Sequence, residues 1–347
     1  MIKVWIELYS IRDEKTENGG FETAMYTLCE ELKSLGNEVR FYSKADICSF
    51  EQLENAIISE SVDMVLPIFE YEYYDYRELY YYTELAARVV RIWHDVSSIC
   101  PKVGCHRICG EPDFCIFKGD AFTPCRHFER SRYQFSLPVH NIFLCPYHWI
   151  PLFKSYDIIP WAVGYLPQCD LRDKNGEVIV LVGKTSNSNI RMLVESLIEA
   201  GERVRIIFSQ WNRNSKEFKK IYRGEWDAYT TIIPAYNIRT DYLTVFSGAA
   251  CLVLLTDFYE TYNFLGHEAQ RTGIPVISYT QSGGLDEASS AQFLDLNQVI
   301  QALKSGAHRK IQPKQIEQAN WADIALKYAN IGERNRLAHS GFKGGPI

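Results

Sequence analysis

The chain has 347 residues, about twice the usual domain length, so its length predicts two domains. Apolar residues make up 46% of it and charged residues 23%, which is typical of a soluble globular protein with large cores. No apolar run approaches the roughly 18 residues of a membrane span, and the N-terminus is not a signal peptide, so we expect no membrane span and a cytoplasmic protein.

Charge is distributed unevenly along the chain. Residues 1–165 contain 16 Lys and Arg against 24 Asp and Glu, a net charge of −8, whereas residues 166–347 contain 21 against 19, a net charge of +2. The acidic half is a poor candidate for tracking nucleic acid, and the more basic half suits an anionic small molecule. Its most basic stretch, 203–223, is interpreted as a strand and a solvated amphipathic helix, with contact to a phosphate-rich acceptor as the alternative.

Predicted strands and helices alternate through both halves, which indicates parallel sheets covered on both faces. The predicted strands are 3–8, 38–43, 63–69, 89–93, 141–145, 178–183, 204–209, 228–233, 251–256 and 275–279. The predicted helices begin near residues 21, 50, 76, 189, 215, 239 and 263, and two more cover 296–304 and 313–329.

A connector rich in proline, glycine and charged residues, 160–176, separates the two halves. We expect a first domain over 1–165, with a Cys-rich insertion at about 96–135. A second domain is expected over 166–330, followed by a polar, frayed tail at 331–347.

Two glutamates, Glu260 and Glu268, are separated by seven residues in E-T-Y-N-F-L-G-H-E. Glu260 follows a predicted strand, and Glu268 lies two turns into a predicted helix over 263–272 that Gly273 ends. At about 1.5 Å per residue, eight helical positions span roughly 12 Å, which suits a nucleotide sugar. The helix N-terminus between the glutamates favours a phosphate. The alternative is that the glutamates only stabilise the start of a helix.

Four segments resemble the family-4 retaining glycosyltransferases of the GT-B fold. E-T-Y-N-F-L-G-H-E-A-Q-R-T-G-I-P-V-I-S with S-G-G-L-D-E at 282–287 looks like the donor-site signature of that family. N-G-G-F-E-T-A-M-Y-T-L-C-E-E-L-K-S-L-G-N-E-V at 18–39 is similar to its first loop, helix and second strand. I-W-H-D at 92–95 and N-W-A-D-I-A-L-K-Y at 320–328 resemble its His-Asp pair and its closing helix. The resemblance implies an α/β protein of the GT-B fold, with two Rossmann-like, doubly wound parallel-sheet domains facing a cleft.

The resemblance also implies residue roles. Glu260 would contact the donor sugar near the reacting centre, His94 would contact the sugar from the first domain, and Glu268 would hold the ribose hydroxyls. The backbone N–H groups of Phe264 and Leu265 would bind the diphosphate. The first loop would approach the phosphates through two glycines that lack a Cβ, Gly19 and Gly20.

The cationic clamp of the family is only partly present. The family has Gly-Arg and, five or six residues later, Lys-Gly, whereas this chain has V-G-K-T-S-N-S-N-I-R. Lys184 replaces the arginine, Asn189 stands where the lysine is expected, and Arg191 is the candidate that compensates. Asn263 stands where a glycine is common, and asparagine tolerates a positive φ better than most residues.

Five of the ten cysteines fall within 26 residues, at positions 100, 105, 109, 115 and 125. Because disulfides are disfavoured in a cytoplasmic protein, this clustering favours a structural zinc. The predicted ligands are Cys105, Cys109, Cys115 and Cys125. Reduced free thiols, disulfides and an iron–sulfur site are the alternatives, and the zinc content of the purified protein distinguishes them.

The sequence therefore predicts a retaining glycosyltransferase with a nucleotide-diphosphate sugar as co-substrate and no catalytic metal. Its acceptor is unassigned: a glycan, a lipid-linked molecule or a small molecule is favoured over nucleic acid. One alternative is a catalytically inactive GT-B-like binding module with a zinc-stapled interaction loop. Another is a transferase that acts on nucleic-acid bases.

Overall fold

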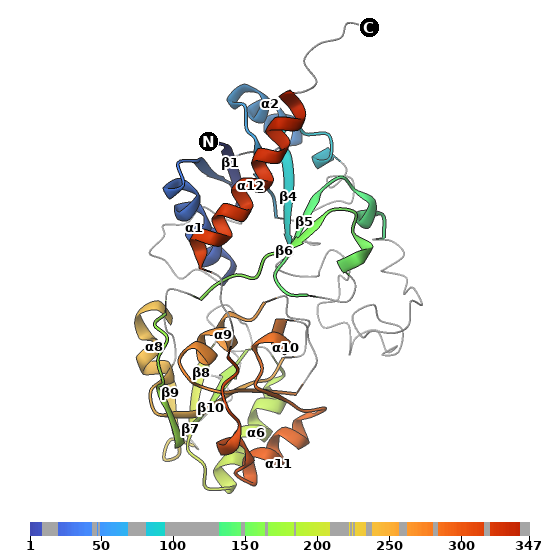
Figure 1. Cartoon of the computed structure of the whole chain (residues 1–347). Coiled ribbons are helices and arrows are strands. Elements are labelled where there is room, and N and C mark those ends of the chain that lie inside the picture. Colours follow the sequence, from blue (N-terminus) through green and yellow to red (C-terminus); the bar gives the residue numbers. More distant parts are fainter. Residues whose placement is uncertain are drawn as a thin grey trace, which may run out of the picture. The chain divides into compact units, whose positions relative to one another are not determined.

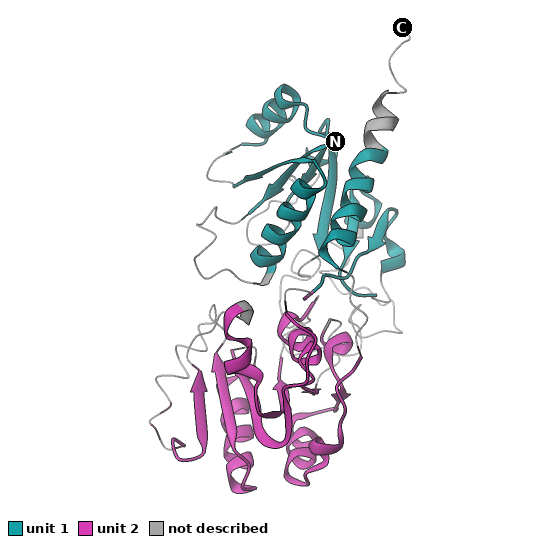
Figure 2. Ribbon diagram, turned by 60° about the vertical axis from the view of Figure 1, so that its left-hand side comes forward, with its two compact units in different colours: residues 1–103, 111–162, 319–347 teal, residues 104–110, 163–318 magenta. Residues whose placement is uncertain are grey.

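The computed structural model describes residues 1–8, 20–43, 47, 49–68, 81–93, 132–146, 150–163, 166–183, 185–208, 222, 224, 226–233, 238–256, 262–279, 284–315 and 320–340. Among these residues, none of the helices combines the length and the hydropathy that a membrane span requires. The described residues form two compact units (Figure 2). Unit 1 contains those within 1–162 and 320–340, and unit 2 contains those within 163–315.

Unit 1 is built on a parallel sheet of six strands in the order β2-β1-β3-β4-β5-β6. The strands are β1 Lys3–Glu7, β2 Glu38–Tyr42, β3 Met64–Leu66, β4 Arg88–Trp93, β5 His140–Phe143 and β6 Tyr156–Ile158. The helices are α1 Gly20–Ser34, α2 Phe50–Glu60 and α12 Trp321–Ser340, with short 3₁₀ turns η3 Arg132–Ser136 and η4 Ile150–Leu152. The side chains of α2 pack on one face of the sheet, where Leu53 and Ile57 meet Trp5, Val65 and Val89.

The C-terminal helix differs from the sequence prediction. The second domain was expected to end at residue 330 with a frayed tail after it, but α12 continues to Ser340 and belongs to unit 1. Its buried residues Trp321, Ile324, Ala325 and Tyr328 recur at helical spacing, which gives it one apolar face. That helix packs against α1 (Figure 1). The chain therefore returns to the first unit after completing the second.

Unit 2 contains a second parallel sheet of six strands, in the order β12-β11-β10-β7-β8-β9. The strands are β7 Arg172–Val182, β8 Val204–Phe208, β9 Thr230–Ile233, β10 Ala249–Leu254, β11 Val276–Ser278 and β12 Ala291–Gln292. The helices are α6 Asn187–Glu199, α8 Ile238–Phe246, α9 Phe264–Arg271, α10 Gly284–Ala288 and α11 Leu296–Lys304, with the 3₁₀ turn η5 Ala307–Lys310.

Alternate residues of β7 belong to two separate cores, one on each face of the second sheet. Val178, Val180 and Val182 pack with side chains of α6 and α11. Ile179 and Leu181 pack with side chains of α8, α9 and α10. Burial on both faces explains why the central strands are continuous apolar runs in the sequence.

Most predicted elements are present, with ends that differ by a few residues. The predicted helices that begin near 76 and 215 lie outside the described residues. Residues 311–315, at the start of the helix predicted over 313–329, are not helical. The sequence prediction missed three short elements, β6, β12 and α10, which have three, two and five residues. Elements this short contain too few positions to show a hydrophobic period.

Candidate functional site

The strand order of unit 2 marks one edge of its sheet as the candidate site. From β7 the chain proceeds to β8 and β9 on one side, and from β10 to β11 and β12 on the other. Neighbouring strands β7 and β10 therefore flank the point where the strand order reverses. Ligands of doubly wound sheets bind outside the carboxyl ends of the strands at this point. The segments that follow β7 and β10 contain the predicted donor-binding residues Lys184, Glu260 and Glu268.

The helix that follows β10 begins with a side-chain cap. The Asn263 side-chain oxygen accepts a hydrogen bond from the N–H of Gly266 at 2.8 Å. Asn263 has φ −112° and ψ 94°, so this residue acts as an N-cap and does not adopt the positive φ that a glycine would permit. Phe264 and Leu265 are the first two residues of α9, and their N–H groups point out of the helix N-terminus, where an anion is favoured.

Glu268 lies in the second turn of α9 and is 3% exposed. The helix ends as predicted, with Thr272 as C-cap and Gly273 at φ 80°. A Cβ at position 273 would lie 2.6 Å from the Asp170 carboxylate, so this glycine is required by both its backbone and its surroundings. The structure thus brings Phe264, Leu265 and Glu268 together on one short, buried helix at the candidate edge.

His267, beside Glu268, is a functional candidate that the sequence analysis did not identify. Its ring stacks on Tyr262, with centroids 4.3 Å apart and planes inclined by 10°. The imidazole is 4% exposed, and neither ring nitrogen has a hydrogen-bond partner among the described residues. Burial, and secondarily the positive charge of Lys314, lower the pKa of His267 to about 3. A single histidine in a short helix of mixed polar and apolar residues has no sequence signal that would predict this environment.

The protein is expected to lose stability in acid through His267. Its pKa is about 3 in the folded state and about 6.5 in the unfolded state, so the unfolded chain binds more protons between these values. The stability that depends on a neutral His267 is fully present above pH 6.5. As the pH falls toward 3, protonation of the unfolded chain lowers the free energy of unfolding by at most about 5 kcal/mol. His267→Leu should flatten the pH dependence of the free energy of unfolding, measured in urea from pH 7 to 4. If the free energy of unfolding of His267→Leu depended on pH as steeply as that of the wild type, the lowered pKa of His267 would be contradicted.

The segment after β7 is described except for Lys184. Gly183 has φ 127°, and Thr185 is buried. The Asn189 amide donates to the Thr185 hydroxyl at 3.2 Å, while the Asn189 backbone N–H donates to Ser186, the N-cap of α6. The residue that replaces the expected lysine therefore supports the start of α6, and it supplies no positive charge to the edge.

Arg191, the candidate for the missing cation, already has partners. Its Nε donates to Glu195 at 2.7 Å, and its guanidinium lies 6.0 Å from the centre of the Trp226 ring. A phosphate would have to compete with this carboxylate. The role of Arg191 in binding a diphosphate stays a prediction.

Several predicted site residues lie outside the described part of the chain. These are Gly19, His94, Lys184 and Glu260, together with Cys105, Cys109, Cys115 and Cys125. Gly20, which was predicted to lie in the first loop, is the first residue of α1, and its approach to the phosphates stays a prediction. Among the described residues, which do not include the cysteine cluster, no three His, Cys, Asp or Glu side chains gather into a metal-binding group. The zinc site stays a prediction.

No family model matches the chain. The UDP-GlcNAc:ribostamycin N-acetylglucosaminyltransferase of Streptomyces fradiae is 29% identical over 346 residues. The match covers 96% of this chain and 92% of that relative.

Solved structures are similar to this chain over almost its full length. A glycosyltransferase from Rickettsia africae has a TM-score of 0.62 at 12% identity and covers 96% of this chain and 98% of its own. Anabaena Alr3699/HepE in complex with UDP-glucose has a TM-score of 0.54 at 8% identity, covering 99% and 100%. These likenesses confirm the predicted fold class, GT-B, with two α/β domains built on parallel sheets.

Proposed function

We propose that this chain of GT-B fold is a glycosyltransferase that transfers a sugar from a nucleotide-diphosphate sugar to an acceptor. One observation supports the proposal most directly: α9 begins at the reversal point of the second sheet and carries the buried Glu268. A helix N-terminus for a diphosphate and a carboxylate for ribose hydroxyls are what a nucleotide sugar requires. The Streptomyces relative, which aligns with 96% of this chain, is named for a nucleotide sugar.

We also propose a uridine nucleotide as the donor. The name of that relative specifies UDP-GlcNAc and ribostamycin, and Anabaena Alr3699/HepE was solved with UDP-glucose and with UDP and glucose. UDP-GlcNAc and ribostamycin are therefore the first donor and acceptor to test.

The proposed reaction proceeds with retention of configuration and without a catalytic metal, as the family resemblance implies. The bond from the anomeric carbon to the diphosphate oxygen breaks, and a bond from that carbon to the acceptor forms on the same face. The acceptor proton passes to the departing diphosphate. The N–H groups at the start of α9 would stabilise the negative charge that develops on the leaving group. Glu260 would stabilise the positively charged sugar.

Binding of nucleic-acid bases through the stretch 203–223 is not favoured. Residues 204–208 are a buried central strand, and Arg205 within it is 9% exposed. Its guanidinium donates to Glu177 at 2.8 Å and to the carbonyl of Val245 at 2.8 Å. The part of this stretch that the structure describes therefore serves the core of unit 2.

Thermal unfolding with UDP, GDP, ADP, CDP and TDP tests the proposal. At about 100 times its dissociation constant a nucleotide stabilises the folded state by about 2.7 kcal/mol, which raises Tm by several degrees. UDP should produce the largest shift. If none of the five raises Tm, the donor site is wrong. If UDP binds but UDP release from UDP-GlcNAc is absent with and without ribostamycin, these substrates are wrong, and absence of release from other UDP-sugars as well would support the inactive binding module.

A further inference from the structure

Helix α10 is too short to hold its own position. It has five residues, Gly284–Ala288, and isolated helices below about 12 residues are marginal in water. It follows β11, whose carboxyl end lies on the same edge of the parallel sheet as those of β7 and β10. Its placement beside α9 therefore depends on tertiary contacts: its Leu285 is buried in the core that it shares with α9, and polar side chains outside the helix bond to it.

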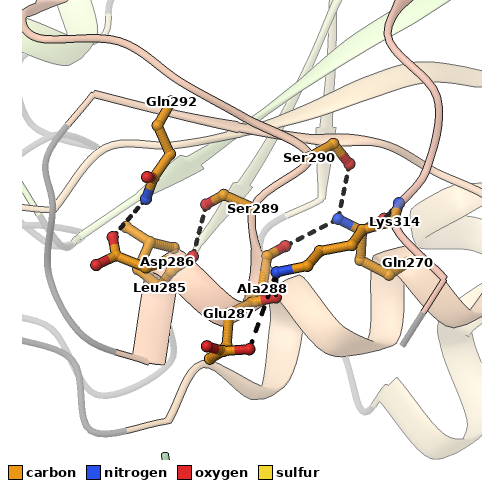
Figure 3. Close-up of polar contacts among 9 residues, drawn as sticks. All are labelled: Gln270, Leu285, Asp286, Glu287, Ala288, Ser289, Ser290, Gln292 and Lys314. Carbon is orange, nitrogen blue, oxygen red and sulfur yellow. Dashed lines mark hydrogen bonds and ion pairs between the residues drawn. The ribbon is translucent and has the colours of Figure 1, made fainter. Parts of the chain in front are cut away.

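The Gln270 side chain makes three hydrogen bonds, to α10 and to the segments beside it (Figure 3). This residue of α9 is 6% exposed. Its amide nitrogen donates to the carbonyl of Ala288 at 2.9 Å and to the Ser290 hydroxyl at 2.7 Å. Its amide oxygen accepts from the backbone N–H of Lys314 at 2.6 Å. Both donor hydrogens and the acceptor are used, so only a side-chain amide can make the full set.

The side chains of Lys314 and Ser289 also hold this helix. The Lys314 ammonium donates to the carbonyl of Glu287 at 3.0 Å and lies 3.9 Å from its carboxylate (Figure 3). The Ser289 hydroxyl donates to the carbonyl of Leu285 at 2.6 Å and lies 2.9 Å from the Ser278 hydroxyl. Helix α10 is thus tied to α9, to β11 and to the segment 311–315.

A glycine permits the close approach of α9 and α10. A Cβ at Gly266 would lie 2.7 Å from the Cβ of Ala288, a separation that real Cβ atoms do not show. Gly266 belongs to the first turn of α9, next to the N–H groups proposed to bind the diphosphate. Gly266 near the start of α9 and Gln270 near its end therefore both favour the packing of α10 against α9.

We propose that Gln270 is a positioning residue that holds α10 against the first turn of α9, so that sugar transfer depends on it more strongly than binding of the nucleotide does. The proposal rests on the proposed function. Gln270 and Glu268 are two positions apart on the helix and so point to different sides of it. Gln270 acts through α10, and Glu268 faces the ribose.

Kinetics of the full chain with UDP-GlcNAc and ribostamycin, followed by UDP release, test the role of Gln270. Gln270→Leu and the isosteric Gln270→Glu should lower kcat by about tenfold to a hundredfold, because small misplacements beside a reacting centre have effects of this size. The affinity for UDP should fall by much less than kcat, because the proposed contact of Glu268 with the ribose is kept. The matched control is Gln301→Leu, at an exposed position of α11, which should leave kcat unchanged.

A second pair of variants separates positioning from general destabilisation. Gly266→Ala should lower kcat in the same way, and adding Ala288→Gly should restore it in part, because the Asn263 amide oxygen at 3.2 Å would still crowd the added Cβ. Unchanged kcat in folded Gln270→Leu and Gln270→Glu, or no restoration by Ala288→Gly, would overturn the proposal.

Hydrogen exchange covers the case in which the wild type releases no UDP. That result refutes the proposed substrates, whereas the position of α10 is still measurable. In the protein without nucleotide, the amides of 284–290 should exchange faster in Gln270→Leu than in the wild type and in Gln301→Leu. Equal exchange in all three proteins would overturn the positioning role itself.

Discussion

Glu268→Ala is expected to abolish the UDP-dependent rise in Tm. The carboxylate is 3% exposed in the second turn of α9, and we propose that it accepts hydrogen bonds from both ribose hydroxyls. A hydrogen bond to a charged group contributes about 1.5–3 kcal/mol, so losing two of them weakens UDP binding by at least about a hundredfold. Thermal unfolding and calorimetric titration with UDP measure the effect.

Two further variants test whether the loss of UDP binding is due to the Glu268 carboxylate. Glu268→Gln keeps the size of the side chain and removes its charge, and UDP should bind it weakly as well. Glu199→Ala removes a surface glutamate of α6 that pairs with Lys304 at 3.3 Å, and its response to UDP should equal that of the wild type. A full UDP shift in Glu268→Ala would refute the assignment to the ribose. A Tm without nucleotide near the wild-type value excludes unfolding as the cause.

Local patterns in the sequence were sufficient to predict β10 and α9, the central elements of the candidate site. The strand β10 is a run of apolar residues because both faces of a parallel sheet are covered. The helix after it was predicted to end at Gly273, and the structure confirms a C-cap at Thr272 followed by a glycine at φ 80°. Apolar runs and turn residues act over a few positions, so they are readable from the chain alone.

Long-range contacts explain what the sequence analysis missed. The amide of Gln270 bonds to Ser290 and Lys314, which are 20 and 44 positions further along the chain. Nothing in its immediate neighbours separates such a residue from an exposed glutamine of a helix. The environment of His267 is likewise tertiary, because burial of α9 sets its pKa.

For Asn263 and α12 as well, the local sequence predicts an element, and contacts in the folded chain decide its detail. Asparagine is compatible both with a positive φ and with an N-cap, and only the position of the Gly266 N–H selects the cap. The apolar positions of α12 predicted a helix, but they do not specify the unit that covers them. Trp321 packs with Trp161 in unit 1, with ring centroids 6.4 Å apart, and this contact joins distant parts of the chain.

Glu260→Gln is expected to lower the turnover of UDP-GlcNAc by at least about a hundredfold while leaving the UDP-dependent rise in Tm intact. Glu260 lies outside the described residues, so this prediction rests on its spacing from Glu268 and on the resemblance of the segment to the donor-site signature. Loss of one preorganised group that stabilises transition-state charge typically costs about a hundredfold to a thousandfold in kcat.

The variants of the two glutamates should differ in the UDP-dependent rise in Tm, although turnover falls in both. Glu268→Ala loses UDP binding, and its turnover falls because the donor no longer binds. Glu260→Gln keeps UDP binding, because the Glu260 carboxylate is proposed to contact the transferred sugar, which UDP lacks. Full turnover in Glu260→Gln would refute its place near the reacting centre. If Glu260→Gln instead lost the UDP shift, its carboxylate would serve the nucleotide, and the proposed assignment of Glu260 to the donor sugar and of Glu268 to the ribose would be wrong.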